Sequence, residues 1–303
     1  MKKKTKGFTL VELLVVIAII ALLMGILMPA LARVRAIAFR MTCGTNLSGI
    51  GKAMLIYAND YDDELPRAGL SGTPTLVRSL TNWNAVNRAD AFTNNQATLT
   101  SSFFLLIKYA EVTPKSFVCK SDSTASEFKL SLFGVASGTE LVDVWDFGVV
   151  DTSHTGGADA YCSYSYHHPY TVYALTTSSD PGMAIAADRN LWVAIVPDPT
   201  TTTPGTAADW TAYQNGINND DSTLIKQGNA IAHQRDGQNV LFVDSHVSFE
   251  KSPACGVDDD NIYTRVTGTS DDRRIGVNTY GNPFDRLDSF MVGNGYGGGG
   301  AGR

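Results

Sequence analysis

One unbroken apolar run near the N-terminus constrains this chain more than any other feature. It extends from Phe8 to Met28, and Glu12 is its only ionisable side chain. At about 1.5 Å of rise per helical residue, a run of this length crosses a hydrocarbon core of about 30 Å. We therefore predict a membrane-spanning helix over about residues 8–30.

The charges in front of this run predict its orientation. Lys2, Lys3, Lys4 and Lys6 directly precede it, and positively charged flanks are retained on the cytoplasmic side of a membrane. The remainder of the chain is therefore expected outside the cytoplasm. Glu12 does not suit a plain anchor, because a carboxylate within lipid is costly and such residues usually have a partner.

The start of the chain resembles a known export signal. A short basic leader, then Gly7, then FTLVE and the apolar run are similar to the class III signal of type IV pilins and type II secretion pseudopilins. The resemblance implies that residues 1–7 are a leader, and that a prepilin peptidase cleaves between Gly7 and Phe8 and methylates the new terminus. It also implies that Glu12 pairs with the terminal amine of a neighbouring subunit, and that Pro29 kinks the helix.

Two simpler interpretations of the apolar run remain as alternatives. An ordinary secretory signal peptide has a shorter apolar core, followed by a small-x-small cleavage site. An ordinary single-span anchor has the right length but gives no reason for Glu12.

The helix is expected to continue beyond the membrane. Apolar residues recur mostly at intervals of three or four: Val34, Ile37, Met41, Leu47, Ile50, Met54 and Tyr57. This spacing is typical of a helix with one apolar face. Gly44, Gly49 and Gly51 weaken it by about 1 kcal/mol each relative to alanine. We predict one helix over residues 8–60, whose second half is stabilised by packing on a globular head.

Residues 61–290 are predicted to form this head, an α+β domain with an antiparallel sheet, followed by a flexible glycine-rich tail at 291–303. The alternation in 240–249 around Asp244-Ser245 predicts a β-hairpin. The segment 43–66 and FVCKSD at 117–122 resemble planctomycete-type DUF1559 heads of large pilin-like proteins. Lys120 departs from that pattern, in which proline is usual.

Four cysteines lie in the exported part: Cys43, Cys119, Cys162 and Cys255. An oxidising compartment permits two disulfides among them, in one of three connectivities. Free buried thiols are the alternative. No two of these cysteines form a CxxC pair, so a zinc site is not expected.

One acidic cluster offers ligands for calcium. Asp258, Asp259, Asp260 and Asn261 are consecutive, and hard oxygen ligands of this kind bind Ca²⁺ in proteins. The spacing is not that of an EF-hand, so a solvated acidic loop is the alternative. We expect no other cofactor.

We predict that the chain is not an enzyme. His233, Asp244 and His246 are the best candidates for a metal or acid–base site, but a structural hairpin explains them more simply. The sequence contains neither a G-x-S-x-G motif nor a P-loop. The net charge of −6 is mild, and without a basic stripe nucleic acid is not an expected partner.

The resemblance implies a structural subunit of a type IV pilus-like filament or a type II secretion pseudopilus. Its partners would be copies of itself, the prepilin peptidase, the inner-membrane assembly platform and the membrane. The head would lie in the periplasm before assembly, and the filament would be periplasmic or extracellular. The alternative is a membrane-tethered binding or enzymatic domain that uses the pilin export route. Its carbohydrate site would be lined by aromatic residues: Trp83, Trp145, Trp192 and Trp210.

Overall fold

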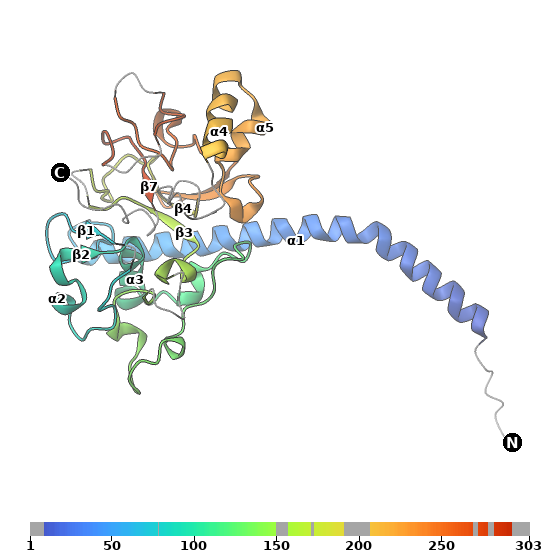
Figure 1. Cartoon of the computed structure of the whole chain (residues 1–303), viewed down its shortest axis with the longest axis horizontal. Helices are drawn as coiled ribbons and strands as arrows, with labels where there is room; N and C mark the ends of the chain where they lie inside the picture. The colour runs from blue at the N-terminus through green and yellow to red at the C-terminus, as the bar shows by residue number, and fades with distance from the viewer. Residues whose placement is uncertain are drawn as a thin grey trace.

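A single long helix carries the head of this protein. The computed structural model describes residues 9–77, 79–149, 157–170, 173–190, 207–268, 272–277 and 282–292. Helix α1, Leu10–Asp60, is continuous over 51 residues. Its C-terminal half lies within the head, and its N-terminal half projects from it (Figure 1). The predicted long helix, half apart from the head and half packed on it, is therefore confirmed.

The projecting half of α1 bends (Figure 1), and Pro29 lies inside this half. Proline has no backbone N–H, and its ring clashes with the carbonyl of the preceding turn, so it bends a helix without ending it when the flanking turns are strong. The bend implied for Pro29 is therefore present.

The head is built on a five-stranded sheet. Its strands are β3 (Tyr164–His167), β4 (Ala184–Asp188), β5 (Gln238–Phe242), β6 (Val247–Glu250) and β7 (Met291–Val292). Their order is β6-β5-β4-β3-β7, and every neighbouring pair is antiparallel. The predicted hairpin is β5–β6, in which Asn239 lies opposite Phe249. The predicted α+β fold with an antiparallel sheet is confirmed.

The sheet is covered on both faces. On one face, α1 approaches β5 so closely that a Cβ at Gly51 would lie 2.7 Å from Leu241 Cδ1. On the other face, Val240 and Phe242 belong to a cluster with Tyr213, which lies on α4 (Ala207–Asn219). Helix α5, Ser222–Ile225, follows directly. The alternation along β5 therefore divides the core into two layers.

The smaller helices and strands lie beside the C-terminal half of α1 (Figure 1). Helix α3, Leu99–Tyr109, contacts α1 and is buried on nearly every side. The apolar run within it, residues 103–107, is too short for its sequence to distinguish a helix from a buried strand. Strands β1 (Thr75–Leu76) and β2 (Gln96–Ala97) form a parallel pair, and α2 is Arg88–Ala91.

One predicted boundary is wrong. Met291 and Val292 do not begin a flexible tail: they form β7 and are 1% exposed. They pair with Tyr166 and His167 of β3 and complete the edge of the sheet. Burial of their two side chains therefore holds them in a strand, although the glycine-rich sequence that follows predicted a flexible tail. The predicted leader 1–7, Phe8 and residues 293–303 lie outside the described residues.

Candidate functional site

The projecting part of α1 exposes apolar side chains in every direction. From Leu10 to Ile37 its large aliphatic side chains are 45–78% exposed. From Cys43 onward the same helix buries one face in the head, including Leu47 and Ile50. By length and composition α1 qualifies to cross a membrane. An apolar surface of this extent needs lipid or protein around it.

Glu12 forms a capping box with Thr9 at the start of α1. Its Oε2 accepts hydrogen bonds from the Thr9 backbone N–H at 2.8 Å and from the Thr9 hydroxyl at 2.7 Å. In return, the Glu12 N–H donates to Thr9 Oγ1 at 3.3 Å. The carboxylate in the apolar run therefore has a partner within its own chain. The T-x-x-E spacing at 9–12 is the sequence signal for it. Gly7 and Phe8, the predicted cleavage site, lie outside the described residues.

The capping box is compatible with the predicted cleavage. Thr9 is the second residue after the Gly7–Phe8 junction, so it keeps an ordinary amide N–H in the processed chain. Both bonds to the side chain use Oε2, and within the described residues Oε1 accepts none. One carboxylate oxygen thus remains for a further donor.

One disulfide fastens α1 to the head. Cys43 on α1 is bonded to Cys119, and the two Cα atoms are 5.1 Å apart. Cys162 is buried and Cys255 is half-buried, and both are free thiols. Burial raises the pKa of the Cys162 thiol to about 12. Of the two bridges that four cysteines permit, the structure therefore forms one, and the free-thiol alternative holds for the other two cysteines.

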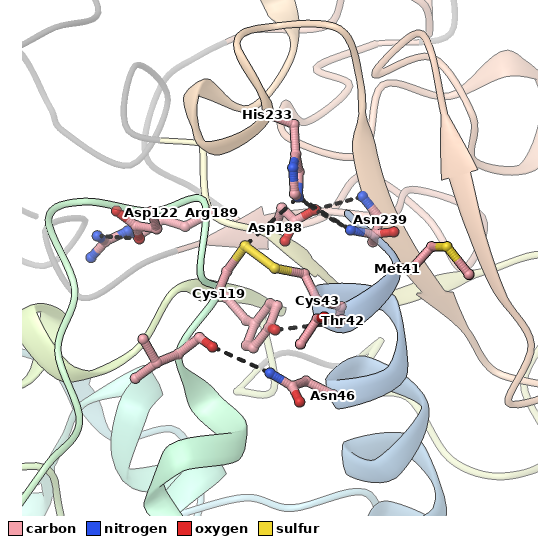
Figure 2. Close-up of a disulfide and its surroundings, with 12 residues drawn as sticks. Met41, Thr42, Cys43, Asn46, Cys119, Asp122, Asp188, Arg189, His233 and Asn239 are labelled. Carbon is pink, nitrogen blue, oxygen red and sulfur yellow. Dashed lines mark hydrogen bonds and ion pairs between the residues drawn. A yellow bond between two sulfur atoms is a disulfide. The ribbon is translucent and has the colours of Figure 1, made fainter. Parts of the chain in front are cut away.

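A buried carboxylate–imidazole pair lies beside this disulfide (Figure 2). Asp188 ends β4, and its Oδ2 is 3.0 Å from His233 Nε2. His233 Nε2 is also 3.7 Å from Cys119 Sγ. The backbone N–H and the side-chain amide of Asn239 donate to Asp188 Oδ2 at 2.7 and 2.9 Å. Asp188 is 0% exposed, and its Oδ1 finds no hydrogen-bond partner among the described residues.

The structure separates His233 from the other two residues considered for catalysis, Asp244 and His246. His246 pairs with Asp244 in the exposed turn of the β5–β6 hairpin, and its ring stacks on Phe242. His233 instead pairs with the buried Asp188. The sequence reasoning missed Asp188, because a single acid at the end of an alanine-rich strand carries no local signal. Only the pairing of β4 with β5 brings it to His233.

The predicted calcium ligands do not converge. Asp258 and Asp259 are exposed. Asp260 is buried and accepts a hydrogen bond from the Ser289 N–H at 2.7 Å. Asn261 Oδ1 accepts one from the Tyr263 N–H at 3.0 Å. Burial and the neighbouring Asp288 raise the pKa of Asp260. Two of the four residues are therefore exposed to solvent and two lie in the core, and calcium binding stays a prediction.

Among the described residues, one group has the composition and spacing of metal ligands. It comprises Cys43, Cys119, Asp188 and His233, whose ligand atoms all lie within 4.8 Å of one another. A groove of about 530 Å³ lies between the projecting part of α1 and the head. His233 lines it together with Arg35, Phe39 and Lys120. The buried cluster therefore reaches this groove through His233.

Two of the four tryptophans considered for a carbohydrate site are buried in the described part of the head. Trp83 and Trp145 are 3% and 5% exposed and belong to the core. The Trp145 indole N–H donates to the Ala85 carbonyl at 2.9 Å. Trp192 and the Trp210 side chain lie outside the described part. Two of the four rings are thus occupied in packing.

Comparison with known families identifies the N-terminal segment. Residues 2–28 match the prokaryotic N-terminal methylation motif. Neither a curated protein nor a solved structure matches the chain. The chain therefore has a prepilin-type N-terminus and, with α1 running into an α+β head, a pilin-like organisation. The motif indicates processing by a prepilin peptidase and anchoring in the membrane through α1. The DUF1559-type head stays a prediction, because the match ends at residue 28.

Proposed function

We propose that the protein is a structural subunit of a type IV pilus-like filament or a type II secretion pseudopilus. The exposed apolar surface of α1 carries this proposal. From Leu10 to Ile37 the helix is about 40 Å long at about 1.5 Å per residue, whereas a bilayer core is about 30 Å thick. Lipid alone leaves about 10 Å of this surface uncovered. Side-by-side packing with α1 of other subunits covers all of it.

Glu12 gives this packing its register. Its free Oε1 is oriented by the capping box and accepts a hydrogen bond from the terminal amine of a neighbouring processed subunit. A charge buried among apolar helices is strongly destabilising without its partner, by about 3–5 kcal/mol when one member of a pair is removed. A wrongly staggered subunit leaves the Glu12 carboxylate with only its neutral partner Thr9, and leaves the amine without an opposite charge. Assembly takes place at the inner-membrane platform, with the heads on the periplasmic side.

The test separates the inter-subunit role of Glu12 from its capping role. Glu12→Ala removes both, whereas Thr9→Ala removes the cap hydroxyl, worth about 1 kcal/mol, and leaves the carboxylate. Both variants are expressed in a strain that lacks the wild-type chain. Membrane fractionation measures insertion, and electron microscopy counts filaments.

Glu12→Ala is expected to insert normally and to form no filaments, while Thr9→Ala retains them. Equal filament loss in both variants would show that the cap, and not an inter-subunit pair, is what assembly requires. Unchanged filaments in Glu12→Ala would contradict the proposal and favour a tethered exported domain.

A further inference from the structure

We propose that the disulfide cluster has a second, metal-bound state. When the bond between Cys43 and Cys119 is reduced, the two thiolates, His233 and Asp188 become the four ligands of a Zn²⁺ ion. Cysteine sulfur, imidazole nitrogen and carboxylate oxygen are the three ligand types that bind zinc in proteins, usually in tetrahedral sites with four ligands. The disulfide and the metal ion are then alternative cross-links between α1 and the head.

The observed distances match a tetrahedral site. With bonds of about 2.3 Å to sulfur and about 2.05 Å to nitrogen or oxygen, neighbouring ligands lie about 3.6 Å apart for sulfur and nitrogen and about 3.3 Å apart for nitrogen and oxygen. Cys119 Sγ and His233 Nε2 are 3.7 Å apart. His233 Nε2 and Asp188 Oδ2 are 3.0 Å apart. The two sulfurs have to separate to about 3.8 Å. The other ligand pairs, which lie within 4.8 Å of one another, have to close around the ion, and rotation of the cysteine side chains supplies both movements.

The pocket is suited to the charge of the metal. A disulfide and a Zn²⁺ ion bound by two thiolates both have zero net charge, so exchanging one for the other adds no net charge to the buried cluster. The Asn239 backbone and side chain orient Asp188 through two hydrogen bonds. Hydrogen bonds of this kind orient metal ligands. Asp188 Oδ1 is buried and without a partner among the described residues, so it is the oxygen that can turn to the ion while Oδ2 keeps its bonds to Asn239.

The change from the disulfide to the metal-bound state requires a reductant. An external dithiol gives two electrons and two protons to the Cys43–Cys119 bond and is itself oxidised to a disulfide. Zn²⁺ then replaces the two thiol protons, which leave to solvent, and the His233 Nε2 proton that faces Asp188 Oδ2 moves to Nδ1 through solvent. The groove lined by His233 and Lys120 provides the route of entry. In the reverse direction a small-molecule disulfide accepts two electrons from the two thiolates and is reduced to two thiols, the Cys43–Cys119 bond forms again and the ion is released.

The test is a cobalt titration of the full chain in detergent micelles. Cys162→Ser and Cys255→Ser are introduced together, so that Cys43 and Cys119 are the only thiols. The chain is reduced with an immobilised phosphine and titrated with Co²⁺ without oxygen. We expect one Co²⁺ per chain, with thiolate-to-cobalt charge-transfer bands and the strong visible absorption of tetrahedral cobalt, both removed by added Zn²⁺. The oxidised chain should show neither.

Two histidine variants in this background locate the site. His233→Gln is expected to weaken Co²⁺ binding by about tenfold or more, whereas His246→Gln, in the exposed hairpin turn, should bind as the parent does. Near-ultraviolet circular dichroism monitors the fold in each sample. The proposal is overturned if the reduced parent shows no charge-transfer band, if reduction unfolds the head and Co²⁺ does not restore it, or if His233→Gln binds as tightly as the parent.

Discussion

Loss of the Cys43–Cys119 disulfide should remove a large part of the stability of the head. The two cysteines are 76 residues apart. Closing a loop of that length in the unfolded chain lowers its entropy by an amount worth about 4.5 kcal/mol at room temperature. A whole domain is typically stable by about 5–15 kcal/mol. The double variant Cys43→Ala/Cys119→Ala is therefore expected to lose about 4 kcal/mol and to be close to unfolding.

Urea unfolding of the full chain in detergent micelles measures this loss. Tryptophan fluorescence reports it, because Trp83 and Trp145 are buried in the head. The matched control is Cys162→Ala/Cys255→Ala, which also removes two cysteines but keeps the loop closed. Only the packing of two thiols is lost there, so we expect it to remain within roughly 2 kcal/mol of wild type.

The reasoning fails if the two double variants are destabilised equally. It also fails if the loss in Cys43→Ala/Cys119→Ala is below about 1 kcal/mol, because the contacts of α1 with the sheet would then hold the helix without the covalent bond. If the substitutions change the slope of the unfolding free energy against urea concentration and leave the midpoint unchanged, they act on the compactness of the unfolded chain.

Two further predictions concern the packing and titration of the head. Gly49→Ala should stabilise the head by about 1 kcal/mol, because a Cβ at this position meets nothing within 4 Å. Gly51→Ala should destabilise it by about 1 kcal/mol, because its Cβ would lie 2.7 Å from Leu241. Urea midpoints that shift in the same direction in both variants would contradict this. Burial lowers the pKa of His168 to about 4, so below about pH 6.5 the unfolded chain binds a proton that the folded chain does not. The stability of wild type relative to His168→Asn should therefore fall by about 3 kcal/mol between pH 7 and pH 4, and a constant difference would refute the assignment.

Local patterns predicted the elements that depend on one segment. The apolar run, the spacing up to Tyr57 and the strand alternation in 240–249 gave α1 and the hairpin, because each pattern is repeated along its own element. The capping box of Glu12 also has a local signal, the T-x-x-E spacing at 9–12. The apolar run 103–107 of α3 has none, because five consecutive apolar residues fit a buried strand as well as a helix.

The candidate site in the head depends on contacts that sequence spacing does not show. Cys43 pairs with Cys119 only because α1 packs beside the segment after Phe117. Asp188 and His233 meet only through the pairing of β4 with β5. Met291 and Val292 become a strand only because β3 offers a free edge. In each case two distant segments have to be placed before the residues acquire a role.

The intact mass of the chain in sheared surface filaments tests the central claim most directly. If the protein is a processed filament subunit, mass spectrometry will find a chain that begins at Phe8, carries one methyl group on its terminal amine and forms the filament. Filaments that lack this chain, or a chain that keeps residues 1–7 and stays in the membrane fraction, would contradict it.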